Sequence, residues 1–325
     1  MKRYDILVAG ELNPDLILSG PSITPAFGQG EILVEDATFT IGSSAAIFAS
    51  AAAKLGLEVG FVGVVGEDQF GQFMLRGLEE RGVDVSPVIV DKALKTGFSV
   101  ILSRGTDRAI LTHLGAINKL RAEQVSDDLL TQSDHLHIAS YFLQTDLQSG
   151  LHDLLSRAKS KGLTTSLDTN WDPEEKWGPE LNEMYPEIDI LLPNEQEARF
   201  LGRAQSWQEG ARAISSQGPM VIVKRGSEGA TAVVENRFID ERARLMEVVD
   251  TTGAGDNFNA GFIYGYLAGW PVDVCLRLAV ACGSLSTQAA GGTGYQPGLE
   301  EALQMADIHI AGHEDPQEEV SDHEG

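Results

Sequence analysis

The segment Asp250–Ala260, DTTGAGDNFNA, combines glycines with a carboxylate, which together could bind an anion and accept a proton. Gly253 and Gly255 permit a tight turn and let a ligand approach the backbone closely. A helix is predicted directly after them, because aromatic residues recur at four-residue spacing, at Phe258, Phe262 and Tyr266. The free N–H groups at such a helix start bind anions, and Asp256 in the first turn could accept a proton from a hydroxyl group. Because glycine and aspartate are also common at helix starts, this short pattern alone leaves a purely structural role open.

The longer string DTTGAGDNFNAGF resembles the C-terminal signature of the ribokinase, or PfkB-type, family of carbohydrate kinases. The resemblance extends over about residues 4–300. It implies that the backbone amides of Gly253, Ala254 and Gly255 hold the transferring phosphate and that Asp256 takes the proton of the acceptor hydroxyl. It also implies a ribokinase-like fold and the use of ATP with Mg²⁺. Phosphoryl transfer depends on positioning and charge stabilisation, which a helix start and a carboxylate can supply.

An acceptor-binding role is indicated directly after the first predicted strand. The string GELNPD, Gly10–Asp15, resembles the family's G-x-x-N-x-D motif, which implies that Asn13 and Asp15 bind sugar hydroxyls. A carboxylate at the carboxyl edge of a strand can accept hydrogen bonds from two neighbouring hydroxyl groups. An aspartate that closes an Asx turn is the structural alternative.

Two further segments bear on the acceptor, and both depart from the family's pattern. Gly42 and Ser43 stand where the family has Gly-Gly-x-x-x-Asn, and these small residues are expected to let the substrate approach. Ala46 replaces the Asn of that motif, which argues against ribose as the substrate. Asn170 lies in a segment similar to the D-x-N-x-R motif of fructokinase-like and ketodeoxygluconate-kinase-like members and is expected to contact the substrate. Asp172 follows where such members carry an Arg, which argues against a sugar acid.

Two pairs of polar residues are candidate metal ligands. Asn194 and Glu197 resemble the family's N-x-x-E motif, which implies an indirect role in binding Mg²⁺, a cation that prefers oxygen ligands and retains its waters. The alternative is that acidic residues here simply favour the first turn of a helix. Asp250 and Thr252 match the part of the family pattern that binds a monovalent cation in some members, so K⁺ is a candidate cofactor.

The nucleotide is expected to bind after a later strand, at KRGSEG. The resemblance assigns Lys224, Gly226, Ser227 and Gly229 to this nucleotide loop, although a plain hairpin turn would have a similar sequence. Other nucleotide-binding and kinase signatures are absent from the sequence: there is no GxxxxGK[ST], no GxGxxG after the first strand, and no DFG.

Alternating strand-like and helix-like segments predict an α/β fold, a three-layer αβα domain with a mostly parallel sheet. Short apolar runs predict strands near residues 5–9, 59–65, 135–138, 164–168, 188–192, 221–224, 230–234 and 245–248. Helical periodicity predicts helices near residues 44–55, 69–81, 148–161, 195–201, 207–216, 256–268 and 272–290.

A small β-sheet lid is predicted apart from this main sheet. Apolar and β-branched runs on both sides of a polar loop predict a hairpin within residues 96–112, and an alternating segment within residues 20–40 could pair with it. The kinase domain is expected to span residues 1–310. Residues 311–325 contain six acidic residues and no Lys or Arg, and predict a disordered tail. Because lid sheets of this type can pair between subunits, a homodimer through the lid is a candidate assembly.

Composition narrows the classes of partner. The net charge of −24 disfavours nucleic acid and anionic membrane surfaces as partners. The family resemblance implies a small sugar-like molecule as the partner instead. Cys275 and Cys282 lie seven residues apart in one predicted helix, too far for a disulfide, which suits a reducing compartment. The first apolar run is too short for a signal peptide, and no stretch reaches the roughly eighteen apolar residues of a membrane span. A cytoplasmic location is predicted.

These patterns predict ATP-dependent phosphorylation of a hydroxyl group, most simply a hydroxymethyl group, on a small sugar or sugar-like polyol. Two alternatives stay open. The first is a nucleoside kinase of the same family, and the second is a catalytically silent, sugar-binding regulator. The intact motif around Asp256 disfavours the regulator.

Overall fold

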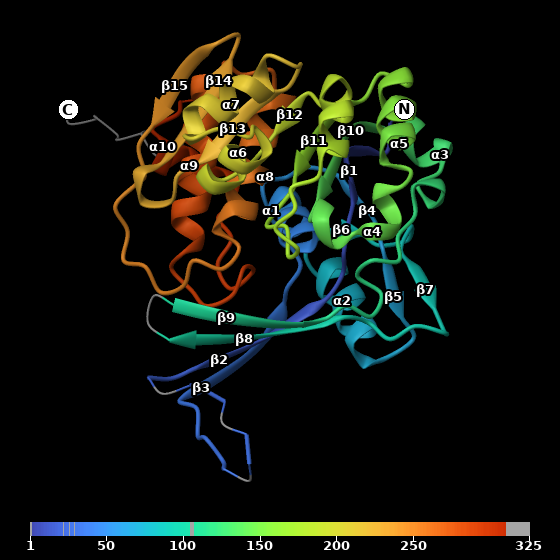
Figure 1. Cartoon of the computed structure of the whole chain (residues 1–325), viewed down its shortest axis with the longest axis vertical. Helices are drawn as coiled ribbons and strands as arrows, with labels where there is room; N and C mark the ends of the chain where they lie inside the picture. Colours follow the sequence, from blue (N-terminus) through green and yellow to red (C-terminus); the bar gives the residue numbers. More distant parts are fainter. Residues whose placement is uncertain (1, 22, 26, 29, 105–106, 310–325) are drawn as a thin grey trace, which may run out of the picture.

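The computed structural model of the chain describes residues 2–309 except positions 22, 26, 29, 105 and 106, so the predicted tail 311–325 lies outside the described residues. A nine-stranded sheet forms the centre of the body, in the order β15-β14-β13-β12-β11-β10-β1-β4-β6 (Figure 1). Its strands are β1 (Tyr4–Ala9), β4 (Val59–Val62), β6 (Val83–Asp84), β10 (Ser133–Ala139), β11 (Thr164–Asp168), β12 (Ile190–Leu191), β13 (Met220–Lys224), β14 (Ala230–Val234) and β15 (Arg237–Glu241). Only the pairs β13–β14 and β14–β15 of this sheet are antiparallel.

Helices cover both faces of the sheet, each over its own apolar core. One layer consists of α1 (Ser44–Lys54), α2 (Gln69–Glu79), α8 (Ala254–Leu267), α9 (Val272–Ser286) and α10 (Leu299–Ala306). The other consists of α3 (Asp127–Thr131), α4 (Thr145–Gln148), α5 (Leu151–Ser160), α6 (Glu195–Leu201) and α7 (Trp207–Ser215). Short 3₁₀ turns complete the described chain: η1 (Ala122–Gln124), η2 (Tyr141–Leu143), η3 (Pro179–Glu187) and η4 (Gly226–Glu228). The predicted three-layer αβα fold is confirmed.

A second, four-stranded sheet projects from the body, below it in Figure 1. Its order is β3-β2-β8-β9, with β2 (Pro14–Ser19), β3 (Asp36–Ile41), β8 (Phe98–Arg104) and β9 (Asp107–His113). The expected hairpin within residues 96–112 is present as β8 and β9. Strand β2, however, begins before the predicted lid segment 20–40, because the apolar residues after Asp15 continue directly into the small sheet. A short parallel pair, β5 (Val64–Gly66) and β7 (Ile89–Asp91), lies beside its root.

The two faces of this projecting sheet, called here the lid sheet, differ sharply in chemistry. The strand registers place Asp15 beside Thr40 and Ser99, and Ile17 beside Ile101, on one face. This face meets the body, because Thr40 Oγ1 lies 3.2 Å from Thr293 Oγ1. The alternate residues form an apolar outer face made of Leu16, Leu18, Phe39, Val100, Leu102 and Leu111.

Two predicted elements were wrong. No strand is present at residues 245–248, where Leu245 and Val248 are exposed, and β14 pairs instead with β15. Glu235 and Asn236 both have positive φ, at 49° and 65°, and form a two-residue hairpin turn that lacks the usual glycine. The second error is the end of α9, which lies at Ser286 and not near residue 290.

Both cysteines, Cys275 and Cys282, are unpaired and buried in α9, as predicted. Among the helices of the described chain, none combines the length and apolar character that crossing a bilayer requires.

Candidate active site

The start of α8 has the geometry of an anion site. Gly253 precedes the helix with φ 74°, and a Cβ atom there would lie 2.4 Å from Cα of Gly292, so only glycine fits. Within the described part of the chain, the N–H groups of Gly253 and Gly255 make no hydrogen bond. Asn257 secures this turn, because its Nδ2 donates to the carbonyl oxygens of Gly253 at 2.9 Å and Gly292 at 3.1 Å. Two amides and the positive end of the helix dipole are thus available to an anion.

Asp256 lies in the first turn of this helix, and the residue is partly buried. Ser44, the first residue of α1, donates a hydrogen bond to Asp256 Oδ1. Burial raises the pKa of Asp256 well above its usual value, and the negative charge of Asp168 raises it further. A carboxylate with a raised pKa is a stronger proton acceptor once ionised, which suits a general base.

Lys224, at the end of β13, lies beside the same anion site. A Cβ atom on Gly255 would lie 3.6 Å from Lys224 Nζ. The ammonium group is 2.5 Å from Asp168 Oδ2, at the end of β11, and Asn259 Nδ2 donates to the same oxygen at 2.5 Å. Burial lowers the pKa of Lys224, but Asp168 and Glu197 raise it by more, so the net shift is upward and the charge is retained.

Glu197 and Asn194 form reciprocal hydrogen bonds at the start of α6. The Asn194 side-chain oxygen accepts from Glu197 N at 2.9 Å, and the Glu197 carboxylate accepts from Asn194 N at 2.8 Å, a capping box. Burial, followed by repulsion from Asp168, raises the pKa of Glu197 to about 7. The predicted magnesium pair, Asn194 and Glu197, therefore lies near Asp168. The same two side chains also stabilise the first turn of α6, which is the structural role given above as the alternative.

Asp15 faces the body from strand β2. A Cβ atom on Gly42 would lie 2.1 Å from Asp15 Oδ1, which explains glycine at that position. Asn13 Nδ2 lies 3.4 Å from the same oxygen. Burial raises the pKa of Asp15 to about 7, with Glu11 adding to the shift and Arg108 opposing it. The predicted acceptor residues Asn13, Asp15 and Gly42 are thus neighbours.

Glu11 is a residue whose role the sequence did not reveal. It is 3% exposed, and its Oε1 accepts hydrogen bonds from Ser140 Oγ at 2.8 Å and from Ala45 N at 3.3 Å. Ser140 also accepts from Asn170 Nδ2 at 3.0 Å, so a hydrogen-bonded chain joins Asn170 to the start of α1. Ser43 Oγ donates to the Glu11 carbonyl oxygen at 2.5 Å and caps α1, which gives its side chain a structural task. Only the position of Glu11 inside the GELNPD motif could have signalled it.

Asp250 and Thr252, the candidate ligands of a monovalent cation, form hydrogen bonds with other groups of the chain. Asp250 Oδ1 accepts from Thr252 N and Thr252 Oγ1, both at 2.9 Å, and its Oδ2 accepts from Gly291 N at 2.8 Å. This carboxylate ties the segment entering α8 to the loop that faces the lid sheet. Of the described residues, no three His, Cys, Asp or Glu side chains gather as ligands of one metal ion.

The predicted nucleotide loop is a tight turn between β13 and β14. Gly226 has φ 54° and open space around it, whereas Gly229 has φ 100° and a Cβ atom there would lie 2.0 Å from the carbonyl oxygen of Glu241. Ser227 is exposed. Of the four residues assigned to this loop, only Lys224 reaches the anion site.

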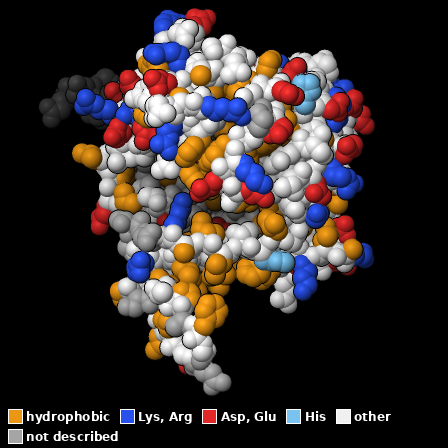
Figure 2. Space-filling view, viewed as in Figure 1, with side chains coloured by type: hydrophobic (Ala, Val, Ile, Leu, Met, Phe, Trp, Pro, Cys, Tyr) orange, Lys and Arg blue, Asp and Glu red, His pale blue; other side chains and the backbone are white. Residues whose placement is uncertain are grey.

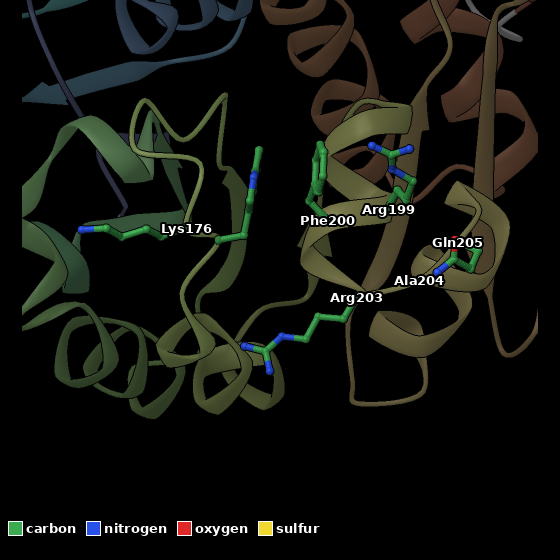
Figure 3. Close-up of a pocket in the computed structure, with 7 residues that line it drawn as sticks. Lys176, Arg199, Phe200, Arg203, Ala204 and Gln205 are labelled. Carbon is green, nitrogen blue, oxygen red and sulfur yellow. The ribbon is translucent and has the colours of Figure 1, made fainter.

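A separate cavity of about 410 Å³ lies along the outer side of α6. It is lined by Lys176, Trp177, Arg199, Phe200, Arg203, Ala204 and Gln205. Figure 3 shows the charged ends of Lys176, Arg199 and Arg203 pointing in different directions, so they do not form one anion site. The loop that borders this cavity is wound around Asp172, whose carboxylate accepts from the backbone N–H groups of residues 174, 176 and 177. Asp172 is therefore a loop-stabilising residue.

The surface is hollowed between the body and the lid sheet, and apolar side chains gather over that sheet (Figure 2).

The model of the pfkB family of carbohydrate kinases matches residues 4–297. A sugar kinase of Archaeoglobus fulgidus is 30% identical over 225 residues, covering 69% of this chain and 89% of the relative. The ATP-dependent ribose-1-phosphate kinase of Halopiger xanaduensis is 29% identical, covering 88% and 93% respectively.

Solved structures of similar fold cover 94% of this chain. Arabidopsis thaliana ribokinase, complexed with ribose and ATP, has a TM-score of 0.81 at 26% identity, with 99% of its own chain covered. An E. coli protein provisionally named ribokinase II, in complex with ATP and Mg²⁺, has a TM-score of 0.84 at 26% identity, with 100% of its chain covered.

Proposed function

The chain belongs to the pfkB family of carbohydrate kinases, and from this premise we propose that it transfers the terminal phosphoryl group of ATP to a hydroxyl group of a small sugar. The observation that carries the assignment of the site is the start of α8. There, two N–H groups that have no partner among the described residues, the Lys224 ammonium and the Asp256 carboxylate surround one position. A transferring phosphoryl group needs positive charge around it and a base for the attacking hydroxyl, and this position offers both.

The residues of the chain then have distinct tasks. Asp256 accepts the acceptor's hydroxyl proton while that oxygen forms a bond to the terminal phosphorus and the bond from phosphorus to the bridging oxygen of ADP breaks. The amides of Gly253 and Gly255 stabilise the charge on the transferring group. Ser44 orients Asp256 through its hydrogen bond. Lys224 remains charged through its ion pair and neutralises the phosphates.

Asp168, Asn194 and Glu197 are the residues we propose for Mg²⁺, through water molecules. Their oxygen atoms lie around Lys224 near the anion site, and oxygen is the donor that Mg²⁺ prefers. When bound, Mg²⁺ neutralises phosphate charge. The ATP and Mg²⁺ complex of the E. coli neighbour supports this choice of cofactors.

The acceptor is proposed to lie between Asp15 and Asp256, with a hydroxymethyl group toward Asp256. Asn13, Asp15, Gly42 and Asn170 are the proposed contacts on the acceptor side. A role for Asp250 and Thr252 in binding K⁺ is also proposed, and would appear as a higher rate in KCl than in NaCl at equal ionic strength. The ATP requirement and the two buried, unpaired thiols support a cytoplasmic location.

Association through the lid sheet is supported by its apolar outer face. Phe39 is 44% exposed and Leu111 is 60% exposed on this face, and a cavity of about 670 Å³ lined by Phe70 and Phe98 lies at its root. Apolar surface on an exposed sheet is best buried against another such sheet, and a second copy supplies a matching face. We propose a homodimer through the lid sheets.

Release of ADP, coupled to an optical assay, tests the function with a panel of pentoses, hexoses, polyols and nucleosides. Turnover of a sugar or polyol is the expected result. Turnover confined to nucleosides would identify a nucleoside kinase. Binding of sugars, seen as a raised melting temperature without turnover of any compound, would instead identify a regulator.

A further inference from the structure

The loop of residues 289–294, which follows α9, contacts both the lid sheet and the start of α8. Three of its residues are glycines, Gly291, Gly292 and Gly294. Because glycine restricts the backbone little, the shape of such a loop depends on the groups that pack against it. These groups come from the lid sheet on one side and from the anion site on the other.

The lid sheet contacts this loop through strand β3. The hydroxyl oxygens of Thr40 and Thr293 lie 3.2 Å apart, within hydrogen-bond distance. A Cβ atom on Gly291 would lie 2.9 Å from Thr40 Cγ2 and 3.5 Å from Ile17 Cδ1, so the lid sheet packs directly against the backbone of the loop. Thr293 is 8% exposed, and a hydrogen bond that is shielded from water is stronger than one at the surface.

The start of α8 contacts the same loop at three points. Asp250 Oδ2 accepts from Gly291 N at 2.8 Å, and Asn257 Nδ2 donates to the Gly292 carbonyl oxygen at 3.1 Å. A Cβ atom on Gly253 would lie 2.4 Å from Gly292 Cα, so the two backbones are in contact. The turn at Gly253, which supplies an amide to the proposed phosphoryl site, therefore rests on this loop.

Helix α1 gives the start of α8 a second support that does not involve the lid sheet. Gln296 Nε2 donates to the Ile47 carbonyl oxygen and to Asn257 Oδ1, both at 3.1 Å. Because this support does not depend on Thr40, loss of the contact between Thr40 and Thr293 should loosen the Gly253 turn without unfolding it.

We infer that Thr293 is a positioning residue for phosphoryl transfer. Its contact with Thr40 lets the docked lid sheet set the geometry of the Gly253 turn through residues 291–293. The lid sheet and the phosphoryl site are thereby coupled, because one loop contacts both. This inference rests on the proposed function and gives the lid sheet a task beyond covering the acceptor.

The kinetic test removes the two hydroxyl groups and keeps the side-chain shape, in Thr40→Val, Thr293→Val and the double variant. At saturating ATP and acceptor, each single variant should lower kcat about three- to tenfold, the size expected for one hydrogen bond. Because both substitutions remove the same contact, the double variant should lose little more than either single one. Thr293→Ser, which keeps the hydroxyl group, should retain most of the wild-type kcat.

Thr38→Val is the matched control. Thr38 lies two residues from Thr40 on the same face of β3, and its hydroxyl donates to Asp36 at 3.2 Å. This variant should keep the wild-type kcat. If the contact between Thr40 and Thr293 merely docked the lid sheet, its loss would raise the acceptor KM, and saturating acceptor would restore the wild-type kcat. That result would overturn the inference.

Hydrogen exchange of the intact protein tests the coupling without turnover. The amides of Asp256 and Asn257 donate to the Gly253 carbonyl oxygen at 3.1 and 3.0 Å, so their exchange reports the state of the turn. In Thr40→Val this exchange should be about three- to tenfold faster, and in Thr38→Val unchanged. Wild-type exchange at both amides in Thr40→Val would contradict the coupling.

The two proposals can fail separately. A wild-type protein that turns over no acceptor would refute the proposed function, and the exchange rates would still decide the coupling. Melting temperatures show whether each variant is folded. Should the buried Thr293→Val fail to fold, Thr40→Val, at a partly exposed position, decides the inference alone.

Discussion

Replacement of Asp256 by Asn separates the proposed chemistry from the architecture of the site. The amide has almost the same size as the carboxylate and can still accept the hydrogen bond from Ser44, so the start of α8 should be preserved. It cannot accept the acceptor's proton. Loss of a positioned general base typically lowers a rate by about 10²- to 10⁴-fold, which corresponds to about 3–5 kcal/mol in the barrier.

Stability should change in the opposite direction from activity. Burial and the charge of Asp168 raise the pKa of Asp256, so the folded chain favours its protonated form. Such a group stabilises the fold fully below its unfolded pKa, and this contribution is lost as pH rises through the raised folded pKa. At pH 8 the Asn variant, which lacks the charge, should therefore melt at the wild-type temperature or above it.

The assay measures ADP release at saturating ATP for wild type, Asp256→Asn and Ser44→Ala, with melting temperatures measured in parallel. The KM for ATP should change little, because the anion site is backbone. Ser44→Ala removes the orienting hydrogen bond but keeps the base, and should lie between the two in rate. A rate for Asp256→Asn within tenfold of wild type, with the fold intact, would falsify the role of base.

The other predictions concern the anion turn, the acceptor carboxylate and the lid sheet. Gly253→Ala should destabilise the fold by about 1–3 kcal/mol and abolish activity, because the new Cβ atom would clash with the backbone and the residue has a positive φ. Gly226 also has a positive φ but lies in open space, so Gly226→Ala should lower the free energy of unfolding by only about 1 kcal/mol. Thermal or chemical unfolding measures both changes. Equal losses in the two variants would contradict the assigned clash. The acceptor KM should rise as pH falls through about 7, the raised pKa of Asp15, and Asp15→Asn should remove this dependence and raise the melting temperature at pH 8 more than at pH 4. A pH-independent acceptor KM in the wild type would refute this. Leu111→Asp should convert a dimer to a monomer in light scattering, while Leu245→Asp, also on an exposed Leu, should not; a dimer in both variants would exclude the lid interface.

The parts of the candidate site whose local structure the sequence predicted are those encoded by neighbouring residues. The start of α8 could be placed because glycines and an aromatic periodicity lie within a few residues of Asp256. Asn194 and Glu197 likewise follow a short strand, and their spacing of three is the capping-box spacing. In such segments the turn geometry and the helix period leave little choice of structure.

The parts that were missed depend on contacts between distant segments. The pair between Lys224 and Asp168 joins residues 56 positions apart, at the ends of two strands that are not adjacent in the sheet. Glu11 reaches Ser140 over 129 positions. Strand β2 was missed because its residues read equally well as a loop after β1, and only pairing with β3 and β8 decides between them.

The lid sheet is attached to the body through the segments of the proposed acceptor site: β2 begins just after Asn13, and β3 ends just before Gly42. A swing of the lid sheet about this attachment would move Asp15 relative to Asp256, and an opened molecule would then lack part of the proposed acceptor site. Stray water bound with ATP would then meet no second carboxylate to hold it in line for attack. With this arrangement, the position of the hinge would itself protect the nucleotide from hydrolysis, and no dedicated gate residue would be required.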